Sequence, residues 1–401
     1  MDLTDVLISL GVAAGAFALW LGTTAVYIWG ERRIIALMQT RIGPNRLGPF
    51  GILQTVADGA KLFFKEDIRP KNIDVAVYFL APAMSAVVAL VTFAVIPYGG
   101  SFEVAGREVN LQVWDPNIGL LWILAMSSIG VYGITLGGWA SGSKYPLLGG
   151  VRSTAQMVSY ELPLGLSLAA VFVWVGSLRT SDVVANQVIP AFEWGPITVP
   201  SWHFLPMIPA FAIFFVTAIA ELQRPPFDLA EAEGELVGGF GTEYSGAKFA
   251  MFYLAEFMNT VTLSAVMVTV FFGGPDGPLF GPAWLQAVLP TVYFMLKVIA
   301  FLFVMVWLRG SLPRFKYNRL MDVGWKVLLP LSLAWVMITA AFVLIRETVD
   351  RGTIITVAIG TFLVLLVLMG VMTVLEKRSA EGSDDDTSVS DTPTDKDRAD
   401  V

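Results

Sequence analysis

The amino-acid sequence predicts an all-α polytopic membrane protein with about nine transmembrane helices and one interfacial helix. The chain has 401 residues, of which 55% are hydrophobic and only 15% are charged, whereas soluble domains carry about 25% charged residues. Nearly all of the hydrophobic content lies in nine long apolar stretches. About 20 consecutive apolar residues are enough to cross the hydrocarbon core as a helix.

The nine expected spans follow one another with polar connections between them. We place them at about 6–30, 75–97, 117–138, 154–178, 204–221, 247–272, 287–308, 327–345 and 353–375. Cytoplasmic loops carry an excess of Lys and Arg. If the N-terminus lies outside, all but five of the 26 basic residues fall in segments on the inner side. We therefore expect an outside N-terminus and a cytoplasmic C-terminus.

The domain organisation follows from the change in composition near the C-terminus. Residues 1–375 form the expected transmembrane domain, and residues 376–401 hold nine acids and four bases. A segment this polar cannot bury a core, so we expect an acidic disordered cytoplasmic tail. The expected cytoplasmic loops are 31–74, 139–153, 222–246 and 309–326.

The first of these loops contains an amphipathic helix. Gln54, Asp58, Lys61 and Lys65 share one helical face, and apolar residues from Ile52 to Phe63 form another. Such a helix is expected to lie in the membrane surface or on a partner. A plain interfacial anchor is an equally good interpretation of the periodicity alone.

Residue types that are missing limit the chemistry of the chain. It has no cysteine and a single histidine, His203, which excludes an iron–sulfur cluster and disfavours a haem or zinc site. No Walker or Gly-rich nucleotide motif is present. We expect no metal and no cofactor bound by this chain. His203 itself is expected in an aromatic belt at the outer membrane surface, beside Trp202 and Phe204.

Acidic residues gather in the segment 221–243, on the side where the other large loops are basic. They are Glu221, Asp228, Glu231, Glu233, Glu235 and Glu243, against the single base Arg224. One interpretation is a site that needs clustered carboxylates. The alternative is a structural network in which the acids pair with Arg32, Arg41 or Arg314.

Three ionisable residues lie inside expected spans: Glu161, Glu256 and Lys297. Burying each one in the bilayer costs roughly 2.5–3.5 kcal/mol on insertion scales, so such residues normally face a bundle interior or a hydrated path. Carboxyl groups of this kind can be set to take up and release protons. A static Glu–Lys pair between helices is the alternative.

Two long motifs resemble those of a known family. The first runs from Glu31-Arg32-Arg33 through Arg41 to Asp58 and Lys61, and the second runs from Glu221 through Arg224-Pro225-Pro226-Phe227-Asp228 to Glu256. Ser143-Lys144-Tyr145 with Ser159-Tyr160-Glu161 resembles a third block. The family is the H subunit of bacterial respiratory complex I, or mitochondrial subunit 1. The resemblance covers about residues 6–345, and Leu222-Gln223 is a minor departure from its usual motif.

The resemblance implies a membrane subunit that helps form a quinone chamber and couples quinone reduction to proton translocation. Spans two to six are similar to the five-helix unit of antiporter-like subunits. By their matching motif positions, the resemblance assigns six residues to the quinone chamber: Glu31, Arg32, Arg41, Asp58, Lys61 and Phe227. In the same way, the resemblance assigns six residues to the proton path: Glu161, Glu221, Glu231, Glu233, Glu235 and Glu256.

Partners follow from the same resemblance. Flavin and iron–sulfur clusters are expected in partner subunits of the peripheral arm, with quinone as substrate, lipid around the spans and no nucleic acid. The expected location is the bacterial plasma membrane. Two alternatives share the buried acids: a homologous subunit of a membrane-bound hydrogenase, and a stand-alone cation/proton antiporter. The antiporter is disfavoured because no internal repeat is visible.

Overall fold

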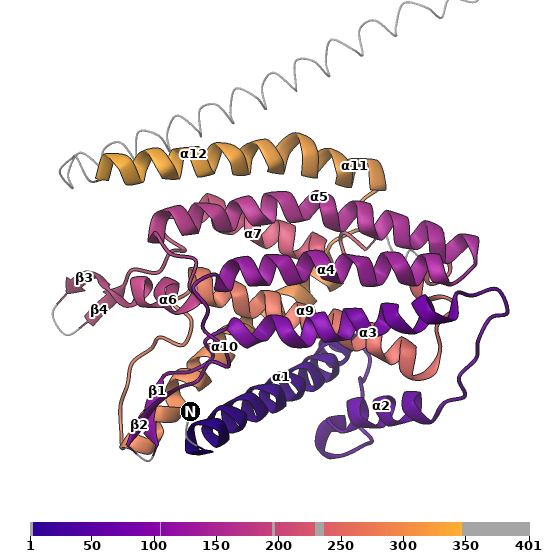
Figure 1. The fold of residues 1–401 in the computed structure, drawn as a ribbon, viewed down its shortest axis with the longest axis horizontal. Helices are drawn as coiled ribbons and strands as arrows, with labels where there is room; N and C mark the ends of the chain where they lie inside the picture. Colours follow the sequence, from indigo (N-terminus) through magenta and orange to yellow (C-terminus); the bar gives the residue numbers. More distant parts are fainter. Residues whose placement is uncertain (1–2, 105, 195–196, 229–235, 347–401) are drawn as a thin grey trace, which may run out of the picture. The chain divides into compact units, whose positions relative to one another are not determined.

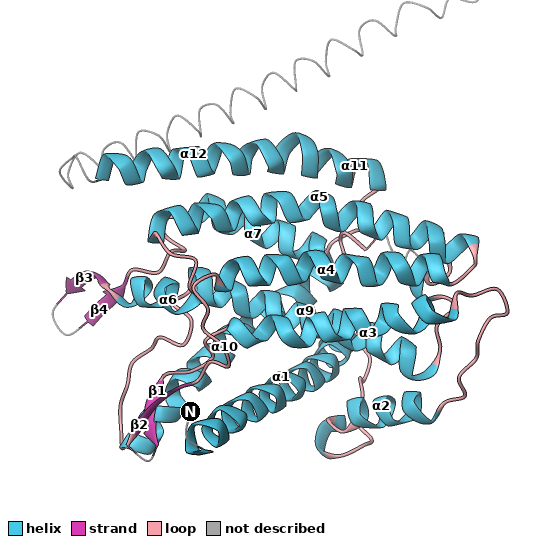
Figure 2. Cartoon of the chain, viewed as in Figure 1, coloured by secondary structure: helices cyan, strands magenta, loops and turns pink. Residues whose placement is uncertain are grey.

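A computed structural model describes residues 3–104, 106–194, 197–228 and 236–346. Nearly all of its regular structure is helical (Figures 1 and 2). The helices are α1 (Leu3–Met38), α2 (Gln54–Phe64), α3 (Val75–Thr92), α4 (Gly119–Ala140), α5 (Lys144–Val175), α6 (Thr180–Val188), α7 (Ile208–Glu221), α9 (Gly246–Phe271), α10 (Ala283–Ser311), α11 (Tyr317–Asp322) and α12 (Leu329–Arg346). Residues 1–339 form one compact unit, and a second unit begins within α12 at Ala340.

The predicted spans coincide with helices wherever the structure describes them. Among the described residues, seven helical segments are long and apolar enough to cross a membrane: α1, α3, α4, α5, α9, α10 and the run Tyr317–Ile345. The eighth, α7, has 14 residues and rises only about 21 Å. The prediction of an all-α membrane protein is confirmed at this level. The ninth predicted span, 353–375, and the tail 376–401 lie outside the described residues.

The centre of the bundle consists of α3, α4, α5, α7 and α9, the helices of predicted spans two to six. Figure 1 shows α3, α4 and α5 running side by side, and α9 packs against α3. Residues 260–271 of α9 are all buried. Small residues let the helices approach closely, as membrane helices often require. A Cβ on Gly150 of α5 would lie 3.2 Å from the Cα of Gly138 of α4.

Helix α5 corrects one predicted boundary. It begins at Lys144, ten residues before the predicted span 154–178, so most of the segment 139–153 is helical. Pro146 falls in the first helical turn, where proline is tolerated. Gly149 and Gly150 are not chain breakers here, because they contact the backbone of Gly239 and of Gly138.

Two antiparallel hairpins are further departures from the predicted all-helical pattern. β1 (Ser101–Val104) pairs with β2 (Arg107–Asn110), and β3 (Pro190–Trp194) pairs with β4 (Ile197–Pro200). Gly106 has φ +76° in the tight connection of the first hairpin, a backbone conformation that glycine adopts without strain. Both hairpins lie in connections between membrane-spanning helices.

The two ends of the bundle differ in what they carry (Figure 1). One end, the α2 end, carries α2 and the connections 39–74, 141–143, 222–228, 236–245 and 312–316. The other end, the hairpin end, carries both hairpins, α6 and the connection 272–282. The linker after α2 is fastened to the start of α9, since Lys248 Nζ lies 2.5 Å from Asp67 Oδ1 and Ile68 N donates to Ser245 Oγ at 3.1 Å.

Candidate functional site

A cavity of about 510 Å³ lies at the α2 end, between the C-terminal half of α1, the turn at Gly43-Pro44, α9 and α10. Three of the predicted chamber residues line it: Glu31, Arg32 and Arg41. Aliphatic and aromatic side chains line the rest, among them Ile28, Ile35, Ile42, Tyr253 and Phe257. A wall that combines apolar side chains with a few charged groups is typical of small-molecule sites.

The charged face of α2 is attached to the same cavity. Asp58 forms an ion pair with Arg32, and Lys61 Nζ lies 3.9 Å from the other carboxylate oxygen of Asp58. Partial burial alone would raise the pKa of Asp58, but the hydrogen bonds from Arg32 and Gln54 and the nearby positive charges outweigh it, so the pKa lies below its usual value. Asp58 is therefore ionised at neutral pH, and Arg32 links α2 to the cavity wall.

Phe227 lies apart from this cavity. Its ring stacks on Phe315 at a centroid distance of 5.5 Å and packs against Tyr160 at 6.0 Å. Its carbonyl accepts a hydrogen bond of 2.8 Å from Gln156 Nε2. The neighbouring Asp228 pairs with Arg314 Nη2 at 3.0 Å. The structure thus does not bring Phe227 together with the other five predicted chamber residues.

An ionic cluster joins the cavity to the bundle interior. Arg224 Nη1 donates to Glu31 Oε1 at 3.0 Å, and Arg224 Nε lies 3.0 Å from Glu256 Oε1. Arg309 forms a further ion pair with Glu31. The exposed fraction is 3% for Glu31 and 6% for Arg224. Two arginines and two glutamates from α1, α9, α10 and the loop after α7 therefore share one site, in which Glu31 and Arg224 are buried and Glu256 and Arg309 are partly exposed.

The Arg224 side chain is also held by an aromatic ring. Its guanidinium carbon lies 4.3 Å from the ring centroid of Phe257, a cation–π distance. The backbone holds the loop after α7 in a fixed shape, since Arg224 N donates to Ile219 O and Phe227 N to Arg224 O. Burying charges is costly unless they are paired and hydrogen-bonded, so this packing fixes Arg224 between its two carboxylates.

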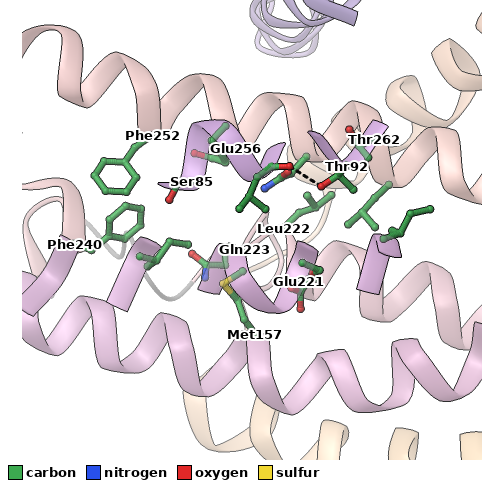
Figure 3. Close-up of a pocket in the computed structure, with 18 residues that line it drawn as sticks. Ser85, Thr92, Met157, Glu221, Leu222, Gln223, Phe240, Phe252, Glu256 and Thr262 are labelled. Atoms are coloured by element: carbon green, nitrogen blue, oxygen red, sulfur yellow. Dashed lines mark hydrogen bonds between the residues drawn. The ribbon is translucent and has the colours of Figure 1, made fainter. Parts of the chain in front are cut away.

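A second, smaller cavity of about 90 Å³ lies inside the bundle. Figure 3 shows Glu221 and Glu256 reaching it from different helices, α7 and α9. Gln223, in the loop after α7, also lines it. Hydroxyl and amide side chains, among them Ser85, Thr92 and Asn259, add polar groups to a mainly apolar wall. A polar cavity of this size has room for a few water molecules. Glu256 therefore faces this cavity while its carboxylate contacts Arg224 of the ionic cluster.

Two adjacent serines of α4 bind the remaining predicted carboxylates. Ser127 Oγ donates to Glu221 Oε1 at 3.1 Å, and Ser128 Oγ donates to Glu161 Oε1. Glu221 is 5% exposed. In the described residues its second oxygen, Oε2, is buried without a hydrogen-bond partner. Glu221 and Glu256 thus line the second cavity, and α4 holds Glu221 and Glu161 through adjacent serines.

Three predicted proton-path residues, Glu231, Glu233 and Glu235, lie outside the described residues. Other residues were missed by sequence reasoning: Arg224 and Arg309 of the ionic cluster, and the two serines. Arg224 did carry a signal, because it is the single base in the acidic segment 221–243. Arg309 and the serines carried none, since basic residues at span ends and serines within spans are common.

Lys297 and His203 lie at the hairpin end, away from these carboxylates. Lys297 Nζ donates to the carbonyls of Phe272, Gly274 and Asp276 at 2.8–3.0 Å, so a Lys297–glutamate pair is not what the described residues show. The His203 ring contacts Val270 O at 3.0 Å and Asn186 Oδ1 at 3.1 Å and is 1% exposed. Both side chains cap the C-terminal end of α9.

Comparison with known proteins matches this arrangement to one class of membrane protein. The sequence profile of the NADH dehydrogenase family matches residues 12–340. The NADH-quinone oxidoreductase H subunit of Thermomicrobium roseum is 48% identical over 83% of this chain and 95% of its own length. The H subunit numbered 1 of Geobacter metallireducens is 48% identical over 85% and 98%, and the H subunit of Frankia casuarinae is 45% identical over 90% and 78%.

These similarities extend through α1 to α12, and so through every helix that lines the two cavities. The chain belongs to the family of the NADH-quinone oxidoreductase H subunit.

Proposed function

We propose that this membrane subunit of NADH-quinone oxidoreductase forms part of the quinone chamber and passes the effect of quinone reduction to buried carboxylates that move protons. The 510 Å³ cavity is the part of the chamber that this chain contributes. Five chamber residues lie at or beside it: Glu31, Arg32, Arg41, Asp58 and Lys61. Glu161, Glu221 and Glu256 begin the proton path, and Glu231, Glu233 and Glu235 belong to it by motif. Phe227 supports the loop that carries Arg224.

A single observation supports this coupling most strongly: Arg224 contacts Glu31 on the chamber side and Glu256 on the side of the second cavity. A guanidinium held between two carboxylates divides its interaction between them, because a closer approach to one weakens its hold on the other. A change of charge in the chamber therefore alters the electrostatic field at Glu256, and with it the affinity of that carboxyl for a proton.

The experiment is Arg224→Gln in the assembled complex, with two activities measured side by side. Quinone-linked NADH oxidation should fall about tenfold or more, because Glu256 loses its positively charged contact while Glu31 keeps only Arg309. Oxidation of NADH by an artificial acceptor should persist, since that acceptor takes electrons before they reach the membrane. Arg179→Gln is the matched control, because Arg179 pairs with Asp115 at the hairpin end and should leave both activities near the parent level.

Equal loss of both activities in Arg224→Gln would indicate failed assembly and a structural arginine. Assembly is therefore measured separately, by recovery of the partner subunits with this chain. Full quinone-linked activity in an assembled Arg224→Gln complex would contradict the proposal.

The orientation proposed from the basic residues places the α2 end in the cytoplasm of a bacterium and the hairpin end outside. Nine spans would then put the C-terminus in the cytoplasm. A reporter fused after Val401 that works only in the cytoplasm should be active, and an inactive reporter on a chain inserted in the membrane would contradict the orientation.

The proposed partners follow from the same function. Subunits of the peripheral arm would supply the flavin and iron–sulfur clusters, dock at the α2 end and close the quinone chamber. Other membrane-arm subunits would receive protons from the carboxylates, with lipid around the remaining spans. The names of the relatives do not favour a membrane-bound hydrogenase subunit or a stand-alone antiporter.

A further inference from the structure

Ser127 and Ser128 occupy consecutive positions on α4 but face different helices. Successive residues of an α-helix are about 100° apart around its axis. Ser127 therefore reaches Glu221 on α7, while Ser128 reaches Glu161 on α5. The two carboxylates lie close enough to act on each other electrostatically. Two neighbouring hydroxyl groups thus serve two neighbouring acids, one each.

A serine hydroxyl in a helix has two places to donate its single proton. It can turn to a side-chain acceptor, or back to the carbonyl four residues earlier. Ser128 shows both acceptors at once, because its Oγ lies 3.1 Å from Leu124 O and also contacts Glu161. A donor bound to a carboxylate stabilises its ionised form. When the carboxyl takes up a proton, the hydroxyl has a partner left on its own helix.

The surroundings leave room for this exchange. Ser127 and Glu221 both line the second cavity. In the described residues, the buried Glu221 Oε2 has no hydrogen-bond partner. Among the described residues, Glu256 lines the same cavity as Glu221 and contacts Arg224, and Asp228, in the loop after α7, pairs with Arg314. No base among the described residues forms an ion pair with Glu161 or Glu221, so the serine hydroxyls are their direct stabilising contacts there.

We propose that Ser127 and Ser128 are positioning residues for proton movement. Each hydroxyl donates to one ionised carboxylate and holds it against α4, and each turns to the carbonyl of its own helix when that carboxyl is protonated. This proposal rests on the proposed function of Glu161 and Glu221. It assigns the two acids to two different faces of one helix, about 100° apart, so that each can change protonation without any movement of α4. It also predicts that each serine affects its own glutamate.

The experiment compares variants of the assembled complex by the pH dependence of quinone-linked turnover. In Ser128→Ala the carboxylate of Glu161 loses its donor, so the profile should move to higher pH by about 0.5–1 unit, the effect of one hydrogen bond. Ser127→Ala should shift the profile in the same direction through Glu221. Ser128→Thr keeps the hydroxyl and should restore the parent profile.

The chain provides a matched control on the same face of α4. Thr135, seven residues after Ser128, contacts Thr154 of α5 by hydroxyl groups 2.6 Å apart. Thr135→Val removes that contact without touching a carboxylate, and its profile should match that of the parent. If Ser128→Ala fails to assemble, Ser128→Cys substitutes a weak donor of similar size and should give a smaller shift in the same direction.

Two outcomes would overturn the proposal. Either Ser128→Ala gives the parent profile, or Thr135→Val moves the profile by as much, in which case the hydroxyls only pack helices. Glu161→Gln separates this failure from failure of the proposed function. If Glu161→Gln abolishes turnover while Ser128→Ala leaves the profile unchanged, only the role of the serine is wrong. If Glu161→Gln itself turns over at the parent rate, the proton path is wrong and the positioning role with it.

Discussion

The α2 end and the hairpin end both bury charged or polar side chains, but these side chains bind different partners. At the α2 end, Arg224 contacts the carboxylates of Glu31 and Glu256. At the hairpin end, Lys297 contacts three backbone carbonyls, and Gln187 binds the backbone of Thr269 and Gly273. Backbone carbonyls cannot titrate, whereas carboxylates can. Arg224 therefore contacts groups that can titrate, whereas Lys297 and Gln187 contact backbone groups and hold α9 in place.

This difference predicts that substitutions at the two ends fail in different ways. At the α2 end they should impair the coupling of quinone reduction to proton movement in complexes that still assemble. At the hairpin end they should lower stability and leave coupling intact.

The largest effect is expected from removing a titrating group inside the bundle. Glutamine keeps the size and hydrogen-bonding capacity of glutamate but cannot titrate. Glu256→Gln or Glu161→Gln should lower quinone-linked turnover about tenfold or more and lower proton pumping with it. Glu161→Asp should retain part of both. The measurements are turnover and acidification in reconstituted vesicles, and parent rates for an assembled Gln variant would make these carboxylates structural.

A smaller effect is expected at the exposed edge of the chamber. Asp58→Ala removes the partner of Arg32, and Arg41→Ala removes a charge from the cavity wall. Because these groups are more exposed than Arg224, each substitution should lower quinone reductase activity only a few-fold. NADH oxidation by an artificial acceptor should persist. Parallel loss of both activities would instead indicate that these residues are needed for assembly.

Lys297→Met tests the hairpin end. Methionine fills a similar volume but leaves three carbonyls without their donor, so we expect a loss of about 2 kcal/mol in stability. The thermal midpoint for dissociation of the detergent-solubilised complex should fall. The ratio of protons pumped to electrons transferred should stay at the parent value, and a changed ratio would mean that Lys297 takes part in coupling.

The pH dependence of stability gives the smallest effect at neutral pH. Burial lowers the pKa of His203 to about 4, partly offset by its bond to Val270, while the unfolded chain would protonate near 6.5. The stabilisation is therefore complete above about pH 6.5 and is lost as the pH falls through about 4. In His203→Gln, the thermal midpoint should depend less on pH over this interval. An unchanged slope in the variant would show that another group sets it.

Hydropathy predicted the membrane-spanning helices well, because burial in lipid is a property of each stretch of chain by itself. It missed the first ten residues of α5, where Gly149 and Gly150 resemble a loop in sequence but serve close packing against Gly239 and Gly138. The first hairpin was also missed, although Gly106 follows four residues of alternating character. Its signal is weak beside nine strong apolar stretches.

The site was predicted as two sets of residues, and the structure shows how they meet. Five of the six chamber residues do gather at or beside one cavity, while Phe227 does not, since its place depends on Tyr160 and Phe315, distant in sequence. The sequence could not show that Arg224 joins Glu31 to Glu256. Residues separated by 193 positions are brought together only by the packing of α1, α7 and α9.

The central claim is that the chamber and Glu256 are coupled through Arg224, and the affinity of a quinone-site inhibitor tests it most directly. If ligand binding and protonation are coupled, each must change the other by the same factor. The measurement is the Kd of the inhibitor against pH for the parent complex, Arg224→Gln and Glu256→Gln. We predict that both variants lose the same part of the parent's pH dependence. Identical pH dependence in all three complexes would contradict the account.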